Sequence, residues 1–423
     1  MTDGQAVYIA LSNLEISLHF GEEKVLHYDL EGRLMMIAHA DRYHRRSLSH
    51  HVLQTRKLPA EDGGGIARLV MPGSSADSLV AEACKLTGQV HWQLFSGAAR
   101  IEFGKPSPEE ARRRLEPWLA KAVRFDVDVA RADARRFESV YGRVAVLPPD
   151  QYNALVVQAT EGCAYNNCLF CDLYHGVRFQ RKSASQFRQH LADVRAYHGT
   201  ALRARRSVFL GEANALTLPQ PDLVEVFQLL REQFEMPAVD AGQQPASWWM
   251  GSDRRFDGVS SFQDVFVGPD RTAEEYAQLR ALGLRRVYIG METGDEALLK
   301  WLKKPASIES ITTTVKALKA AQIAVGVIVL VGAGGRQFAG AHVRESARVL
   351  NELPLGRGDY IYFSPLEVHA GGSYSVQSIK DHIELLTDVE LRHQETALRG
   401  ALQFDEKRGK PYVARYELAT FVY

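Results

Sequence analysis

From about residue 150 onward, short apolar runs alternate with stretches that have the periodicity of amphipathic helices. Six of the apolar runs are expected to be strands: Ala154–Ala159, Ser207–Leu210, Phe262–Val267, Arg286–Gly290, Val325–Val331 and Asp359–Ser364. Nearly continuous apolar strands separated by helices indicate a parallel sheet that is covered by helices. On the pattern alone, a partial barrel and a doubly wound α/β sheet both fit.

The ends of these expected strands carry the most distinctive residues of the chain. In both candidate folds, ligands bind at the carboxyl ends of the parallel strands. A cysteine loop follows the first strand, Gly211-Glu212 ends the second, and Gly290–Gly294, Gly332–Gly335 and Ser364 end the last three. The sequence therefore predicts one functional site at this edge of the sheet.

Three of the four cysteines are clustered. Cys163, Cys168 and Cys171 have the spacing C-x4-C-x2-C, and Cys84 is remote from them. Clustered thiols in a chain with so few cysteines are typical of metal sites. A structural zinc site needs four ligands, so Cys84, a histidine such as His175 or an acidic residue would have to complete it. Iron–sulfur cubanes normally have four thiolates, and three thiolates leave one iron open for a reactive ligand.

The segment around these cysteines, Glu161–Tyr174, resembles the cluster loop of the radical S-adenosylmethionine (SAM) superfamily. In that family three cysteines bind a [4Fe–4S] cluster, its open iron chelates SAM, and an aromatic residue precedes the last cysteine. Phe170 stands in that place, and the resemblance implies that its backbone approaches the adenine. The first gap here has four residues, where the commonest pattern has three. The fold implied is α/β, a partial (β/α)6 TIM-like barrel over about residues 150–370.

Two carboxylates and a lysine extend the resemblance. Leu210-Gly211-Glu212 is similar to the motif that receives the methionine ammonium group of SAM. Tyr288–Gly294 resembles the fourth-strand motif of the branch that includes oxygen-independent coproporphyrinogen dehydrogenase and the methylthiotransferases. This implies that Glu292 binds the ribose hydroxyls and that Lys304 pairs with the methionine carboxylate. Judged on the residues alone, the alternative for Glu212 is a helix cap, and the alternative for Lys304 is a solvated helix end.

Two further positions are implied at the adenine. Gly326–Gly332 resembles the fifth-strand glycine motif against which adenine packs, which gives Gly332 a place in the site. Ser364 lies where the backbone of the family meets the adenine. Cys84 is in a segment with helical character, and we expect it to be a packing residue. Donation of a hydrogen atom to a substrate radical is the alternative for this thiol.

The remainder of the chain has a different pattern. Residues 1–145 predict an N-terminal α+β accessory domain with a charged helix over 108–122. Its expected strands are Val7–Leu11, Glu15–Phe20, Lys24–Tyr28 and Arg33–Ala38. The core is expected over 146–370, with an insertion over 231–261 before the third strand. Residues 371–423 predict a C-terminal helical extension, with one long helix from about residue 378 and a closing strand.

Composition narrows the functional classes. Lys+Arg and Asp+Glu both count 51, so the chain lacks the basic excess of a general nucleic-acid binder, although a local patch is not excluded. The longest apolar stretch, Ile323–Val331, is about half as long as a membrane span. No signal peptide is visible at the N-terminus. We therefore expect a cytoplasmic protein with no membrane partner and no indicated nucleic-acid partner.

The function implied by the resemblance is reductive cleavage of SAM at a [4Fe–4S] cluster, followed by hydrogen abstraction from a substrate. No cobalamin-binding segment or RNA-binding appendage is recognisable, so we expect a small-molecule substrate. The expected outcome is decarboxylation, dehydrogenation, epimerisation or rearrangement. Modification of RNA or a peptide is the second hypothesis, and a non-catalytic zinc or electron-transfer iron–sulfur protein is the third. The expected protein partner is an electron donor such as flavodoxin or ferredoxin.

Overall fold

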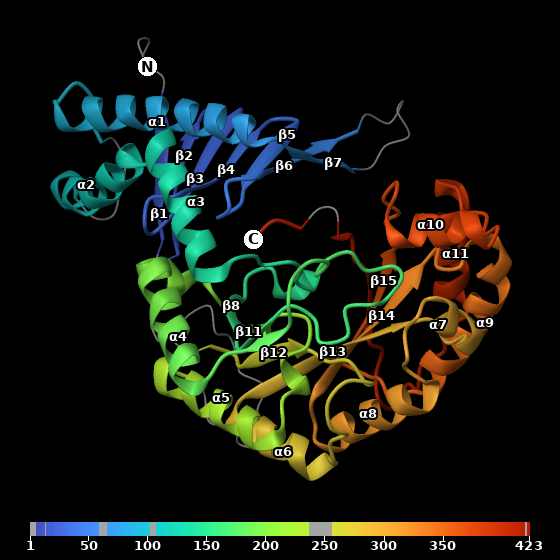
Figure 1. The fold of residues 1–423 in the computed structure, drawn as a ribbon. Helices are drawn as coiled ribbons and strands as arrows, with labels where there is room; N and C mark the ends of the chain where they lie inside the picture. Colours follow the sequence, from blue (N-terminus) through green and yellow to red (C-terminus); the bar gives the residue numbers. More distant parts are fainter. Residues whose placement is uncertain (1–5, 13, 59–65, 102–106, 237–255, 419–420) are drawn as a thin grey trace. The chain divides into compact units, whose positions relative to one another are not determined.

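The computed structural model describes residues 6–12, 14–58, 66–101, 107–236, 256–418 and 421–423. The chain divides into two compact units, each built around its own seven-stranded sheet. The first unit consists of Met1–Arg143, Asp193–Arg205 and Ala419–Tyr423, and the second of Val144–Ala192 and Arg206–Leu418. Figure 1 shows both units coloured along the chain.

The sheet of the first unit is antiparallel, and its strands follow one another in chain order. They are β1 (Val7–Leu11), β2 (Glu15–Phe20), β3 (Lys24–Asp29), β4 (Leu34–His39), β5 (Arg42–Arg46), β6 (Val52–Lys57) and β7 (Ile66–Met71). Side chains alternate along each strand, so Ile16, Leu18 and Phe20 of β2 belong to the core while Ser17 and His19 lie on the opposite face. The strands expected in this region are confirmed, and β5, β6 and β7 are additional.

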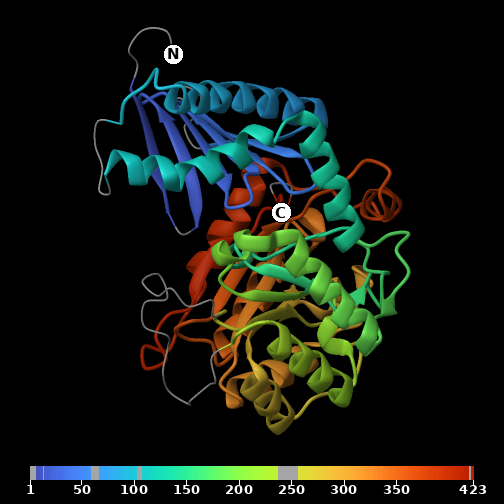
Figure 2. The same cartoon turned by 90° about the vertical axis from the view of Figure 1, so that its left-hand side faces the viewer.

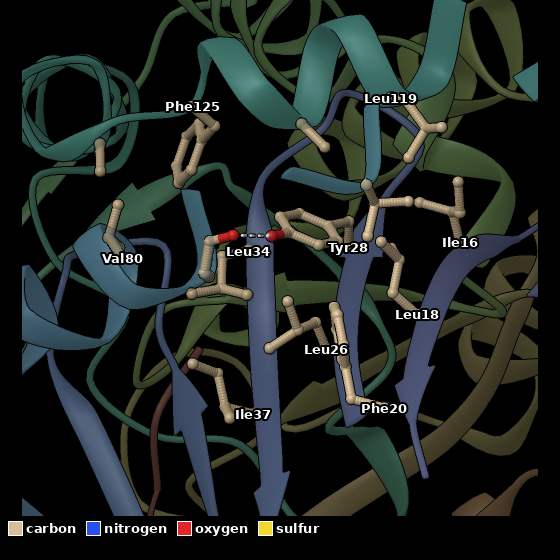
Figure 3. Packing of buried hydrophobic residues seen from close by; sticks show 14 of the residues in the cluster. Ile16, Leu18, Phe20, Leu26, Tyr28, Leu34, Ile37, Val80, Leu119 and Phe125 are labelled. Atoms are coloured by element: carbon tan, nitrogen blue, oxygen red, sulfur yellow. Dashed lines mark hydrogen bonds between the residues drawn. The ribbon is translucent and has the colours of Figure 1, made fainter. Parts of the chain in front are cut away.

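The helices of the first unit are α1 (Gly73–Phe95), α2 (Pro108–Arg124) and α3 (Val127–Tyr141). Figure 2 shows α1 and α2 lying across one face of the sheet. The core between sheet and helices contains Tyr28, whose ring is packed among apolar side chains (Figure 3). Its hydroxyl bonds to the Thr87 hydroxyl at 2.7 Å and donates to the Ala83 carbonyl at 3.3 Å, so the buried polar atom is satisfied.

The sheet of the second unit is parallel throughout, in the order β16-β15-β14-β13-β12-β11-β8. Its strands are β8 (Leu155–Gln158), β11 (Val208–Gly211), β12 (Val259–Phe262), β13 (Leu284–Glu292), β14 (Ala324–Val331), β15 (Tyr360–Pro365) and β16 (Tyr412–Arg415). Each strand pairs with the next one in the chain, without the reversal of order that defines a doubly wound sheet. The sheet is therefore that of a partial barrel, with β8 and β16 at its two edges.

Helices follow the strands of this sheet. They are α4 (Ala184–His198), α5 (Gln220–Gln233), α6 (Ala273–Leu282), α7 (Glu296–Trp301), α8 (Ile308–Ala320), α9 (Gly335–Glu352), α10 (Ser373–Lys380) and α11 (Asp388–Gly400). In Figure 1, α4, α5, α6 and α8 form an arc outside the strands, as right-handed crossovers in one direction require. None of the described helices combines the length and the apolar character that crossing a bilayer requires.

The third strand differs from its expected position. It runs over Val259–Phe262, whereas the apolar run predicted Phe262–Val267. The strand contains two buried serines, and the Ser261 hydroxyl donates to the Leu210 carbonyl on β11 at 2.7 Å. Serines whose hydroxyls are hydrogen-bonded can be buried in a strand, but they add no apolar residues to the sequence pattern from which strands are predicted. As a result, Asp264 follows the strand and belongs to the functional edge of the sheet.

The C-terminal segment also differs from expectation. The single long helix predicted from about residue 378 is two helices, α10 and α11, because the Thr387–Glu390 capping box begins a new helix. The expected closing strand is confirmed as β16, which pairs in parallel with β15. Most of the insertion expected over 231–261 lies outside the described residues.

The amino ends of the strands are joined by one partly buried carboxylate. Asp150 accepts hydrogen bonds from Arg286 at 2.6 Å, Tyr288 at 2.6 Å and Tyr362 at 2.7 Å. These donors lie on β13 and β15, so a single charge-assisted network holds the inner strands together at this end. The carboxyl ends of the strands, at the opposite edge of the sheet, carry the candidate site, as is usual in barrels.

Candidate functional site

The cysteine loop is closed at its base by a two-residue antiparallel ladder. β9 (Thr160–Glu161) pairs with β10 (Gln180–Arg181), and the three cysteines lie between them. Two contacts with the end of α7 hold the loop in place. The Leu169 amide donates to the Leu302 carbonyl at 2.9 Å, and the Tyr165 hydroxyl donates to the Lys303 carbonyl at 2.6 Å. The predicted ligands are thus carried on a loop that is fixed to the fourth β–α unit.

The three thiols of the loop are partly buried. Burial raises the pKa of Cys168 to about 12 and that of Cys171 to about 11, and it also raises the pKa of Cys163. The positive charge of Lys304 opposes this shift at each sulfur without outweighing it. The thiols therefore stay protonated at neutral pH unless a metal displaces their protons.

Three thiols on one loop are a donor set that fits an iron–sulfur cubane. In the described part of the chain, no three His, Cys, Asp or Glu side chains have a geometry that would hold one metal ion. A zinc site needs four such ligands around one centre, whereas the thiolates of a cubane each bind a separate iron. His175, one suggested fourth ligand, faces Asp172 at 3.2 Å, and the Cys84 thiol donates to the Val123 carbonyl at 3.3 Å within the first unit.

Glu212 faces the beginning of the cysteine loop. It follows β11, and its two carboxylate oxygens accept from different neighbours. Gln158 at the end of β8 donates to Oε1 at 2.8 Å, and the Gly162 amide donates to Oε2 at 3.4 Å. The structure thus places this predicted site residue beside Cys163, with its carboxylate held by both the sheet and the loop.

Glu292 and Lys304 form a buried ion pair. Lys304 Nζ donates to Glu292 Oε1 at 2.9 Å, and the two residues are 5% and 7% exposed. Burial by itself lowers the pKa of Lys304, but the charges of Glu292 and Asp264 outweigh it and raise that pKa above its usual value. Lys304 therefore carries its charge, and two residues predicted to contact different parts of SAM contact each other.

The backbone at Glu292 explains the glycines around it. A register shift between β13 and β14 at Gly290 and Glu292 brings Glu292 to a φ of +61°. A Cβ on Gly290 would lie 2.2 Å from Glu292 Oε1, and a Cβ on Gly294 would lie 2.3 Å from the Glu345 carbonyl oxygen. A side chain at position 290 would displace the Glu292 carboxylate from the ion pair, and position 294 requires glycine because the backbone of α9 approaches so closely.

A polar cluster on α9 supports the turn after Glu292. The Gly294 amide donates to the Ser346 hydroxyl at 2.8 Å, and the Thr293 hydroxyl lies 2.8 Å from His342 Nδ1. Burial lowers the pKa of His342 to about 4, so this imidazole is neutral at physiological pH. The turn is thus fixed without adding a charge beside the ion pair.

Two residues that the sequence did not single out complete the network. Asp264 Oδ1 lies 3.9 Å from Lys304 Nζ, and Asn214 hydrogen-bonds both to Asp264 and to the Cys163 sulfur. Both residues come shortly after a strand, β12 and β11 respectively. The signal in the sequence that could have identified them is their position just after a strand. For Asp264 this signal was hidden, because the third strand was predicted over Phe262–Val267 and so included Asp264.

Phe170 connects the cysteine loop to the fifth strand. Its ring packs against the apolar cluster that includes Leu330 and Ala333 at the end of β14. Lys304 Nζ lies 5.9 Å from the centroid of this ring and 5.6 Å from that of Phe266. The loop, the β14 end and the ion pair therefore form one continuous site.

Gly332 and Ser364 lie at the same edge of the sheet. Gly332 has a φ of +91°, and its amide donates to Gln394 of α11 at 2.7 Å. A Cβ there would lie 2.5 Å from Leu391, also on α11, so this helix covers one side of the predicted glycine. Ser364 is 2% exposed and pairs in register with Leu330.

A family comparison agrees with the sequence pattern. Residues 157–339 match the model of the family described as the radical SAM superfamily. The matched segment contains the cysteine loop and both strand-end carboxylates. No curated protein matches this chain.

Several solved structures are similar to parts of the chain. Coproporphyrinogen III oxidase from Escherichia coli, a radical SAM enzyme, is 14% identical, with 59% of this chain and 52% of that chain covered and a TM-score of 0.41. The radical SAM methyltransferase TsrM from Kitasatospora setae is 16% identical, with 57% and 44% covered and a TM-score of 0.38. HydG, a maturase of the [FeFe]-hydrogenase, is 14% identical, with 81% and 71% covered and a TM-score of 0.38. The chain thus spans about half the length of the first two.

Proposed function

From the premise that residues 157–339 form a domain of the radical SAM superfamily, which uses a [4Fe–4S] cluster and SAM, we propose an enzyme that abstracts hydrogen from a small molecule. We propose that Cys163, Cys168 and Cys171 are the ligands of its cluster. The chemistry such a cluster supplies is one electron, which breaks the C5′–S bond of SAM and releases methionine and a 5′-deoxyadenosyl radical. The observation that carries the proposal is the convergence of three thiols, two carboxylates and a lysine at one edge of the parallel sheet.

The carboxylates and the lysine give the site a charge pattern that suits SAM. We propose that Glu212 receives the methionine ammonium, that Lys304 pairs with the methionine carboxylate and that Glu292 accepts from the ribose hydroxyls. Phe170, Gly211, Gly332 and Ser364 would contact the cofactor through their backbones or by packing. The Glu292–Lys304 pair supports this assignment because the hydrogen bond between the two side chains holds both of them oriented at the site until their ligand groups are bound.

The substrate and the reaction outcome belong to the proposal. A zero net charge gives no general attraction for nucleic acid, which favours a small-molecule substrate over RNA. We propose decarboxylation, dehydrogenation, epimerisation or rearrangement as the reaction class. We also propose a cytoplasmic location, where flavodoxin or ferredoxin could supply the electron.

The proposed cleavage has a direct test. Anaerobically reconstituted protein, reduced with dithionite, should convert SAM to methionine and 5′-deoxyadenosine slowly even without substrate, as chromatography would show. The matched control is the protein in which all three cluster cysteines are alanine, which should leave SAM intact. Intact SAM in the parent protein, under conditions where its cluster is demonstrably reduced, would contradict the proposal.

The assigned SAM contacts predict specific losses of affinity. Glu212→Ala and Glu292→Ala should each weaken SAM binding while leaving the iron content unchanged. Loss of a charge-assisted hydrogen bond costs about 1.5–3 kcal/mol, which is roughly ten- to a hundredfold in affinity. Calorimetric titration measures the change, with Glu309→Ala, an exposed acid in the first turn of α8, as the control. An affinity equal to that of the control would show that the residue in question does not contact SAM.

A further inference from the structure

Asn214 joins a proposed cluster ligand to the acidic network. It follows β11, is 2% exposed, and has hydrogen-bonding partners on two sides. Its Oδ1 accepts from the Asp264 amide at 3.0 Å, and its Nδ2 donates to the Asp264 carboxylate. The same Nδ2 lies 3.6 Å from the sulfur of Cys163, within reach of an N–H···S hydrogen bond.

The orientation of this amide is determined by Asp264. If the amide were reversed, its oxygen would face the Asp264 carboxylate and the Cys163 sulfur, and its NH2 group would face a backbone N–H donor. Only the observed orientation satisfies all three neighbours. One N–H of the Asn214 amide thus donates to the Asp264 carboxylate, and the second N–H is available to the Cys163 sulfur.

We propose that Asn214 is a positioning residue that hydrogen-bonds the Cys163 thiolate and sets the reduction potential of the cluster. The inference rests on the proposed function, since it requires Cys163 to be a cluster ligand. Reduction adds a negative charge to the cluster, and hydrogen bonds to its sulfurs are among the factors that set its potential. A donor stabilises the reduced form more than the oxidised form, so Asn214 raises the potential and eases the entry of the electron.

The Asn166 backbone amide also donates to this sulfur, at 3.3 Å, but a side-chain substitution leaves that bond in place. Asn214 is therefore the contact that can be tested separately. Asn214→Leu removes the donor at similar volume. Asn214→Asp keeps the shape, removes the donor and adds a negative charge near Asp264 and the sulfur. Gln263→Leu is the matched control, because Gln263 is another buried amide just past β12, and its side chain bonds Tyr276 instead of a sulfur.

The experiment is a redox titration of the reconstituted holoprotein, monitored by electron paramagnetic resonance and accompanied by iron analysis. We expect full iron content in all variants. Asn214→Leu should shift the reduction equilibrium about tenfold toward the oxidised form, which is about 59 mV for a one-electron couple. Asn214→Asp should shift it further in the same direction, and Gln263→Leu should match the parent protein.

Three results would contradict the proposal in distinguishable ways. Parent-like potentials in both Asn214 variants at full iron content would overturn the inference and leave the proposed function standing. Low iron content with the remaining cluster at the parent potential would overturn it in favour of a role in folding alone. A parent protein that binds no cluster would overturn the proposed function and the inference with it.

Discussion

Changing Cys163, Cys168 and Cys171 together to alanine should lower the iron content from about four atoms per chain to near zero. Each of these thiols is the proposed ligand of a separate iron, so the triple variant loses all three proposed protein ligands of the cluster. Sulfide should fall in parallel, and reductive cleavage of SAM should be lost. Iron and sulfide analysis of anaerobically reconstituted protein measures the change, and absorption spectroscopy follows the cluster.

The fourth cysteine provides the matched control for this experiment. Cys84 lies on α1 in the first unit, and its thiol donates to the Val123 carbonyl at 3.3 Å. Burial raises its pKa, so the thiol is protonated at physiological pH. Cys84→Ala should therefore keep all of the iron. Iron near eight atoms per parent chain, or a cluster spectrum that survives in the triple variant, would contradict both the count and the assignment of ligands.

The main features of the site could be predicted because strand ends are visible in the sequence. In a parallel sheet the carboxyl ends meet at one edge, so Cys163, Glu212 and Glu292 could be placed together from their order alone. The apolar runs of β13 and β14 determined where those ends lie. The weakest prediction was the third strand, because β12 buries serine hydroxyls in place of apolar groups.

The contacts between site residues could not be predicted in the same way. Lys304 is twelve residues beyond Glu292, and their ion pair depends on the register shift and the positive φ at Glu292. Neither feature has a local sequence signal beyond the neighbouring glycines. The same holds for Asn214, because its role is inferred from its distance to the Cys163 sulfur, which lies on a different segment of the chain. In the first unit, β5 was not predicted because Arg42–Arg46 consists of three arginines, a tyrosine and a histidine and has no apolar period.

Lys304→Met should produce the largest loss of stability of any single substitution at the site. Lys304 neutralises Glu292 at 2.9 Å and faces Asp264 at 3.9 Å, so its removal leaves a buried carboxylate without a counter-charge. Breaking a buried ion pair by removing one partner costs about 3–5 kcal/mol. The loss should be local to the second unit, since both residues of the pair belong to it.

Hydrogen exchange is the suitable measurement, because it reports the free energy of opening segment by segment in a chain of two units. We expect the amides of β13 and β14 to lose about 3–5 kcal/mol of protection in Lys304→Met. Lys303→Met changes an exposed neighbouring lysine and should have little effect. The double variant Lys304→Met with Glu292→Leu should recover much of the loss, since replacing a whole buried pair with apolar residues is often neutral. A Lys304→Met protein as stable as Lys303→Met would contradict the prediction that Lys304 stabilises the buried Glu292 carboxylate. The Glu292–Lys304 ion pair would then contribute nothing measurable to the stability of the second unit.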